Sequence, residues 1–189
     1  MIRFLRRKWP PVLKLIGWGF LVVYLLRYRV HFEPAWVAVF LAIFVAGGVL
    51  YVFLVKPLLQ KVLRRQFDEG EPESLYPNAK NMALVMGIRR NPLGEFLLLP
   101  GEVGFFLVPL MILGLSWLTA IIFGVLWGFV HFQNYSIVQC TVKAVLLTTA
   151  ILIVLPHGLL TFVAGHLILD GVGFVALHLV GRDKEATSG

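Results

Sequence analysis

Long apolar runs separated by short polar stretches make up most of this chain. Residues 35–55, AWVAVFLAIFVAGGVLYVFLV, carry no charge and at about 1.5 Å per residue can cross the ~30 Å hydrocarbon layer as one helix. Residues 103–130 are also uncharged, and a run of 28 positions exceeds one ordinary span. We therefore expect a turn inside this run, at Gly114-Leu115-Ser116.

The whole pattern predicts an all-α fold, a polytopic transmembrane bundle of about six helices. The expected helices lie near residues 11–27, 35–56, 95–114, 116–133, 138–156 and 158–180. Polar residues rich in acidic side chains, Gly and Pro divide the chain, and Asn91-Pro92 suits the start of a helix because proline fits a first turn. We expect an N-terminal transmembrane hairpin at 1–59, a cytoplasmic connection at 60–91, a four-helix core at 92–181 and a cytoplasmic tail at 182–189.

Composition supports the same class of protein. Of the 189 residues, 59% are hydrophobic and 14% charged, and the mean hydropathy is +0.85, outside the usual range of soluble domains. The N-terminal MIRFLRRKWPP and the apolar run after it lack a small-residue cleavage site, which favours an uncleaved first helix. The single Cys140 excludes an internal disulfide and fits a buried thiol.

The net charge of +7 could suggest a nucleic-acid partner, but the basic residues cluster beside the apolar spans. With six helices, only Arg27 and Arg29 fall on one side of the bilayer. The other side carries Arg3, Arg6, Arg7, Lys8, Lys56, Lys61, Arg64, Arg65, Lys80, Arg89, Arg90, Arg182 and Lys184. By the positive-inside rule that side is cytoplasmic, and both termini lie there. The expected partner is thus the lipid bilayer, and we expect no nucleic-acid partner, because membrane topology explains the basic residues.

Charged side chains inside a span cost roughly 2.5 to 3.5 kcal/mol each on insertion scales, so each one needs an explanation. Glu102 is expected about 10 Å inside the cytoplasmic surface, and His131 closes the next helix on that side. His166 and Asp170 are four residues apart and share a helix face. Convergence of these four is geometrically possible. Separate explanations remain open, since His131 can be an interfacial residue and Glu95 can simply favour a helix N-terminus.

Two segments carry a resemblance to a known family. Residues 115–134, LSWLTAIIFGVLWGFVHFQN, resemble the second motif region of the CAAX-protease and bacteriocin-processing (CPBP, or Abi) family of intramembrane endopeptidases, with Trp127 and His131 in its aromatic-x-x-x-His motif. Residues 157–172, HGLLTFVAGHLILDGV, resemble the later His-x-x-x-Asn/Asp motif at His166 and Asp170. The family's Glu-Glu-x-x-x-Arg motif has no full match, because both Glu102 and Glu95 lack the paired acid and the Arg.

The resemblance implies a hydrolase acting on a membrane-associated peptide or protein substrate. It implies Glu102 as general base, with Glu95 as the alternative, and His131 as the group that assists or polarises the carbonyl. His166 and Asp170 would complete the site, although an ionised Asp cannot donate a hydrogen bond as Asn does. No cofactor is implied. A zinc ion held by Glu102, His131 and His166 is chemically conceivable, but no HExxH helix supports it.

An alternative from a different class is a non-catalytic membrane subunit that uses the same helices to hold a membrane protein complex. A small transporter is a third possibility, although the sequence contains no inverted repeat. Residues 155–158, Leu-Pro-His-Gly, resemble a stretch in sporulation-type membrane proteins. His157 within this stretch is expected to be a loop or cap residue at the outer surface, and His31, in the short outer loop, is expected to be solvated.

Overall fold

The computed structural model describes residues 2–28, 30–55, 57–58, 61, 92–130 and 137–186, and in this part the fold is entirely helical, with no strand. The all-α prediction is therefore confirmed. Six α-helices occur in the described part: α1 (Ile2–Arg27), α2 (Pro34–Leu50), α5 (Pro92–Leu113), α6 (Trp117–Val130), α7 (Ile137–Val154) and α8 (Leu159–Ala186). Two short helical segments complete the described part: the π-helix η1 (Tyr51–Val55) continues directly from α2, and the 3-10 helix η2 (Leu155–His157) joins α7 to α8.

The helix ends follow local chemistry. Helix α5 begins at Pro92, as expected for proline in a first turn. Helix α1 begins well before residue 11 and α8 continues past residue 180, because a hydropathy pattern marks only the apolar part of a helix. The π-helix η1 at the end of α2 was not predicted.

The predicted turn between α5 and α6 is confirmed. Gly114 has φ of +93°, a left-handed value that costs glycine little. Ser116 and Thr119 then cap α6 reciprocally, because the Thr119 N–H donates to Ser116 Oγ at 3.1 Å and the Ser116 N–H donates to Thr119 Oγ1 at 2.9 Å. The turn thus reverses the chain in three residues.

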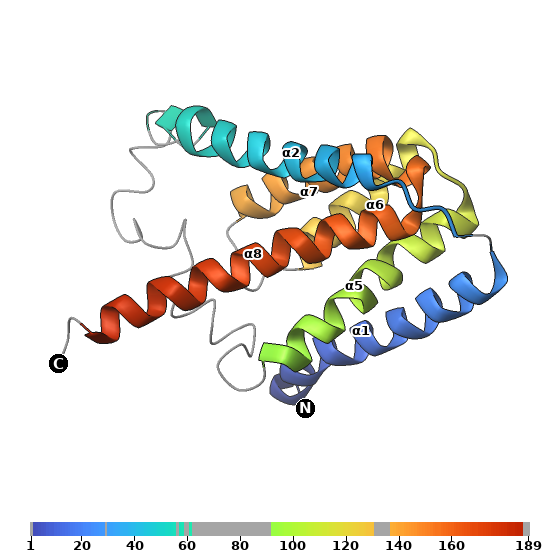
Figure 1. The fold of residues 1–189 in the computed structure, drawn as a ribbon, viewed down its shortest axis with the longest axis horizontal. Helices are drawn as coiled ribbons and strands as arrows, with labels where there is room; N and C mark the ends of the chain where they lie inside the picture. Colours follow the sequence, from blue (N-terminus) through green and yellow to red (C-terminus); the bar gives the residue numbers. More distant parts are fainter. Residues whose placement is uncertain are drawn as a thin grey trace.

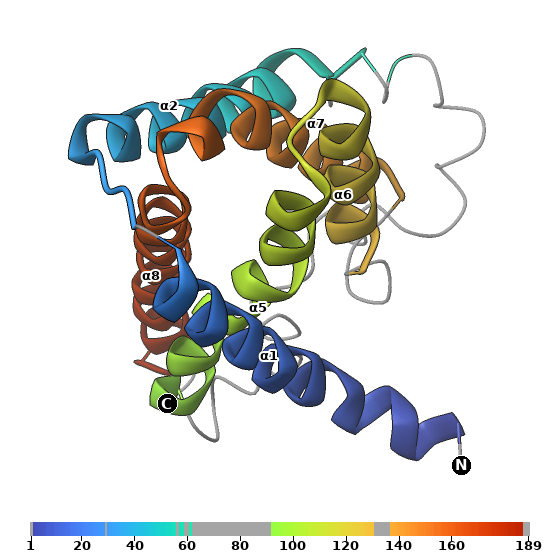
Figure 2. The ribbon, with the colours of Figure 1, turned by 90° about the vertical axis from the view of Figure 1, so that its right-hand side faces the viewer.

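The helices run in alternating directions through the bundle. Helices α1 and α5 start near the same end and lie side by side, whereas α2 and α8 run back the other way (Figure 1). Both views place α1 and α2 on opposite sides of the bundle, where α2 packs on α7 and α8 (Figure 2). The two N-terminal helices therefore each pack on the C-terminal part, and the division of the chain at residue 59 stays a prediction.

Small residues allow the closest helix contacts. A methyl group on Gly17 of α1 would overlap the carbonyl oxygen of Gly101 on α5. On α6, Gly124 and Gly128 form a G-x-x-x-G pair that faces α7, where a side chain at either position would overlap Thr148 or Ala144. Membrane helices commonly associate through such small-residue faces, because the close approach of two backbones supplies the packing energy.

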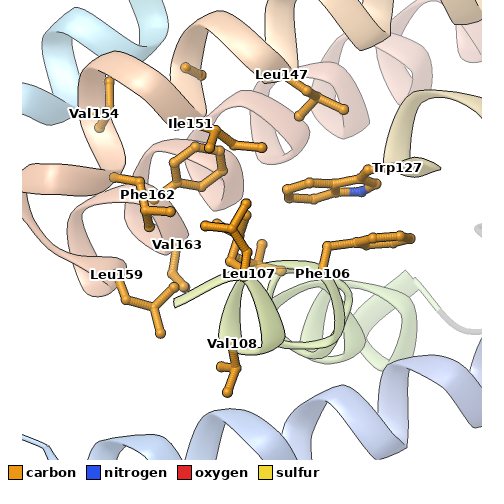
Figure 3. Packing of buried hydrophobic residues seen from close by; sticks show 14 of the residues in the cluster. Phe106, Leu107, Val108, Trp127, Leu147, Ile151, Val154, Leu159, Phe162 and Val163 are labelled. Carbon is orange, nitrogen blue, oxygen red and sulfur yellow. The ribbon is translucent and has the colours of Figure 1, made fainter. Parts of the chain in front are cut away.

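Three helical segments in the described part are long and apolar enough to cross a bilayer: Pro34–Val55, Phe96–Leu113 and Cys140–His157. The apolar helices Trp117–Val130 and Leu159–Val172 are shorter. The chain is therefore a membrane protein. Its core gathers where α5, α6, α7 and α8 meet, with Trp127 lying over Phe106 and with Leu147 and Phe162 nearby (Figure 3).

Candidate functional site

Glu102 lies inside the bundle on α5 and is 8% exposed. The Trp127 indole Nε1 donates a hydrogen bond to Glu102 Oε1 at 2.7 Å. The other carboxylate oxygen, Oε2, lies 3.7 Å from Lys14 Nζ of α1. Two oxygens of one buried carboxylate therefore connect three helices, α1, α5 and α6.

Lys14 explains how a carboxylate is tolerated at this position. An unpaired charge in an apolar interior loses its hydration, whereas an opposite charge close by offsets part of that cost. The sequence prediction missed this partner. A signal was present, because Lys14 is the one charged residue between Trp9 and Leu26, and single charges in two different spans are expected to pair.

Trp127 is the centre of the cluster. Its ring is fully buried and stacks on Phe106, with the ring centroids 5.2 Å apart and the planes 10° from parallel. It also lies beside the His166 imidazole, at a centroid distance of 5.1 Å and a tilt of 51°. Glu102 and His166 thus contact the same indole, Glu102 through the indole N–H (Figure 3 shows the indole and Phe106).

His166 and Asp170 share a face of α8, as their spacing predicts. His166 is 3% exposed, and its Nε2 lies 3.2 Å from Asp170 Oδ2. This contact is close enough for an ion pair, but its alignment falls short of a hydrogen bond, and no other described residue bonds either ring nitrogen. The Phe40 ring contacts the imidazole edge-on at 6.4 Å. The imidazole thus contacts the two aromatic rings of Phe40 and Trp127.

The structure brings together only part of the predicted site. Glu102, His166 and Asp170 belong to one cluster around Trp127. His131 and the side chain of Glu95 lie outside the described residues, so their predicted roles stay predictions. Among the residues that the structure does describe, no three His, Cys, Asp or Glu side chains are arranged to hold a metal ion.

A second polar cluster lies at the end of the bundle where α2 and α8 begin. His157 Nδ1 lies 3.2 Å from Glu33 Oε2, and its ring stacks on Trp36 at 3.5 Å and 11°. The Glu33 N–H donates to Thr161 Oγ1 at 2.8 Å, and this hydroxyl donates to the His157 carbonyl at 3.0 Å. His157 ends the 3-10 helix η2, as expected for a loop or cap residue, and its contact with Glu33 also joins the start of α2 to the turn between α7 and α8.

The fold and these clusters define an all-helical integral membrane protein with a buried polar centre. The chain matches no model of a known protein family, no curated protein and no solved structure. The resemblance to the CPBP family, and the activity that it implies, therefore stay predictions.

Proposed function

We propose that the chain is a non-catalytic integral membrane protein that holds a membrane protein partner within the bilayer. The observation that carries this proposal is the engagement of both Glu102 oxygens, one by the Trp127 indole and one by Lys14. A general base needs a carboxylate directed at a water molecule and a substrate. Here the carboxylate instead joins helices, which is the role of a structural cross-link.

The outer surface supports the second part of the proposal. Helix α2 and η1 form the least buried of the three long apolar segments. Large side chains on this segment are exposed, among them Val45, Leu50, Phe53 and Leu54. Such a face is suited to contact either lipid or the apolar helix of a partner, and neither use requires chemistry at the buried cluster.

For the topology, we propose six crossings with both termini in the cytoplasm. The alternating helix directions support this arrangement (Figure 1). The concentration of Lys and Arg beside one set of span ends in the sequence supports it as well. Helix α6 has 14 residues and a length of about 21 Å, so the bilayer must thin locally or its flanks must extend the crossing. Reporter fusions test the topology. A fluorescent protein fused after Gly189 should fluoresce, because that end lies in the cytoplasm in this arrangement, and alkaline phosphatase fused at Phe32 should be active, because Phe32 lies on the opposite side.

One observation favours a second candidate, the CPBP-like endopeptidase. Glu102 and His166 contact the same indole, so two of the groups that the resemblance implies lie in one buried region. In this candidate Glu102 is the general base, with Glu95 as the alternative, and His131 assists it. His166 and Asp170 complete a site that hydrolyses a membrane-associated peptide.

One experiment separates the two candidates. Cells lacking the chain are complemented with the wild type, Glu102→Gln, His166→Ala or the control Glu33→Gln, and the N-terminal peptides of all membrane proteins are quantified. In parallel, a photo-crosslinking residue at Phe53 reports contact with a partner. We expect unchanged N-terminal peptides and a retained cross-linked product in every variant that folds. Cleavage products that disappear in both cluster variants, but not in the control, would establish the peptidase instead.

A further inference from the structure

A cavity of about 330 Å³ lies at the end of the bundle where α1 finishes and α8 begins. Met111 lines it from the end of α5 and Leu115 from the turn that follows. Leu155 and Leu159 line it from either side of the turn between α7 and α8, and Tyr24 and Leu25 from α1. Met111 is nine residues from Glu102 along the chain, so the cavity lies about 13 Å along the helix axis from the buried polar cluster. The cavity is therefore a separate site.

Its lining resembles that of a site for a ligand with a long apolar part. The volume falls within the range of about 300 to 1,000 Å³ typical of small-molecule pockets. Among the described residues of the lining, Tyr24 and His31 bring polar side-chain groups. Tyr24 also stacks on Tyr28 at 4.7 Å. Tyrosine is enriched where the hydrocarbon layer meets the headgroups, which places this cavity at that level of the bilayer.

The wall of the cavity is formed in advance by tight contacts. Gly158 has φ of +119°, and any side chain there would overlap the carbonyl oxygen of His31. The bonds of Glu33 to His157 and Thr161 fasten the same turn to the start of α2. A pre-formed cavity loses little conformational freedom when a ligand enters, and this favours binding.

A basic residue on α1 follows the lining residues Tyr24 and Leu25 in the sequence. Arg27 is the last residue of α1 and is exposed. It follows Tyr24 by three positions, so both lie on one face of α1, with Arg27 almost one turn nearer to the membrane surface. Glu33 carries the nearest described carboxylate along the chain, and it is directed to His157.

From these observations we propose that the cavity binds one acyl chain of an anionic phospholipid, with the phosphate of its headgroup beside Arg27. The apolar lining takes the chain, the interfacial tyrosines mark the depth, and the guanidinium favours the negative headgroup. This inference is independent of whether the chain is a scaffold or a peptidase.

The test uses the purified full-length protein in nanodiscs. Phosphatidylglycerol and phosphatidylcholine, each with a diazirine in the acyl chain, are photolysed and the modified peptides are mapped by mass spectrometry. We expect labelling at Leu115 and Leu159, with phosphatidylglycerol labelling about fivefold stronger and the preference lost in Arg27→Gln. Met111→Trp should fill the cavity and remove most of this labelling.

The matched control is Ile112→Trp, which places the same residue on the 67% exposed neighbouring position. The lipids should label this variant as strongly as they label the wild type. Thermal unfolding identifies any variant that fails to fold. Leu115→Phe is the milder substitution to use if Met111→Trp does not fold. Equal labelling in the cavity and control variants would overturn the acyl-chain site, and equal labelling by the two lipids would overturn the anionic preference.

Discussion

Removing Lys14 should destabilise the bundle more than removing both partners of its ion pair. At the 3.7 Å separation of Lys14 Nζ and Glu102 Oε2, and with an effective dielectric constant near 20, the attraction is about 4.5 kcal/mol before desolvation. The side chains are only 17% and 10% exposed, so Lys14→Met leaves a buried carboxylate without its counter-charge. Breaking such a pair costs about 3 to 5 kcal/mol, and partial exposure places our expectation near 3 kcal/mol.

The double variant Lys14→Met with Glu102→Gln removes both charges and keeps an acceptor for the Trp127 N–H. We expect it to recover most of the lost free energy of unfolding, because an apolar or neutral replacement of a buried pair is often close to neutral. Reversible unfolding of the full chain in bicelles measures all four members of the cycle. Leu15→Met, on the 61% exposed adjacent position, is the control. A loss of less than about 0.5 kcal/mol in the free energy of unfolding for Lys14→Met would refute the reasoning. A loss in the double variant as large as the sum of the losses in the two single variants would refute it as well.

Three further predictions concern single contacts, each measured by the same unfolding assay. Trp127→Phe keeps a ring on Phe106 but loses the bond to Glu102, so we expect a loss of about 1 to 3 kcal/mol, and no loss would show that the bond is dispensable. Gly17→Val should lower the free energy of unfolding by about 1 to 3 kcal/mol, because the added side chain overlaps α5. Gly48→Val should lower it little, because the structure has open space at Gly48. A double-mutant cycle of Glu33→Gln and His157→Gln should give a coupling free energy below about 1 kcal/mol, because the two side chains are 45% and 30% exposed. A larger coupling would indicate a stronger contact than this exposure allows.

The helices were predictable because the bilayer imposes a length on apolar segments. The turn at Gly114-Leu115-Ser116 followed from that length alone, and its capping by Ser116 and Thr119 agrees with it. Helix ends beyond the apolar part were missed, since the hydropathy pattern gives no information there. The packing of α1 on α5 was also missed, because a chain that is apolar on nearly every face does not reveal which face meets which helix.

The candidate site was predictable only as a set of unusual residues. Burial of Glu102 and His166 followed from the cost of polar groups in hydrocarbon. Their connection through Trp127 did not, because an indole N–H in an apolar segment looks the same whether or not it meets a carboxylate. The contact of His157 with Glu33 spans 124 positions and could not be found from local spacing.

The side-by-side packing of α1 and α5 has a consequence for how the protein is made. Lys14 and Glu102 are 88 positions apart, so at about 5 to 20 residues per second the ribosome needs roughly 4 to 18 s to supply the carboxylate after the lysine. In the six-crossing arrangement that we propose, α1 carries an unneutralised ammonium group during this interval, at a cost of roughly 2.5 to 3.5 kcal/mol on insertion scales. The apolar side chains of α1 would have to offset that cost until the middle of the chain has emerged.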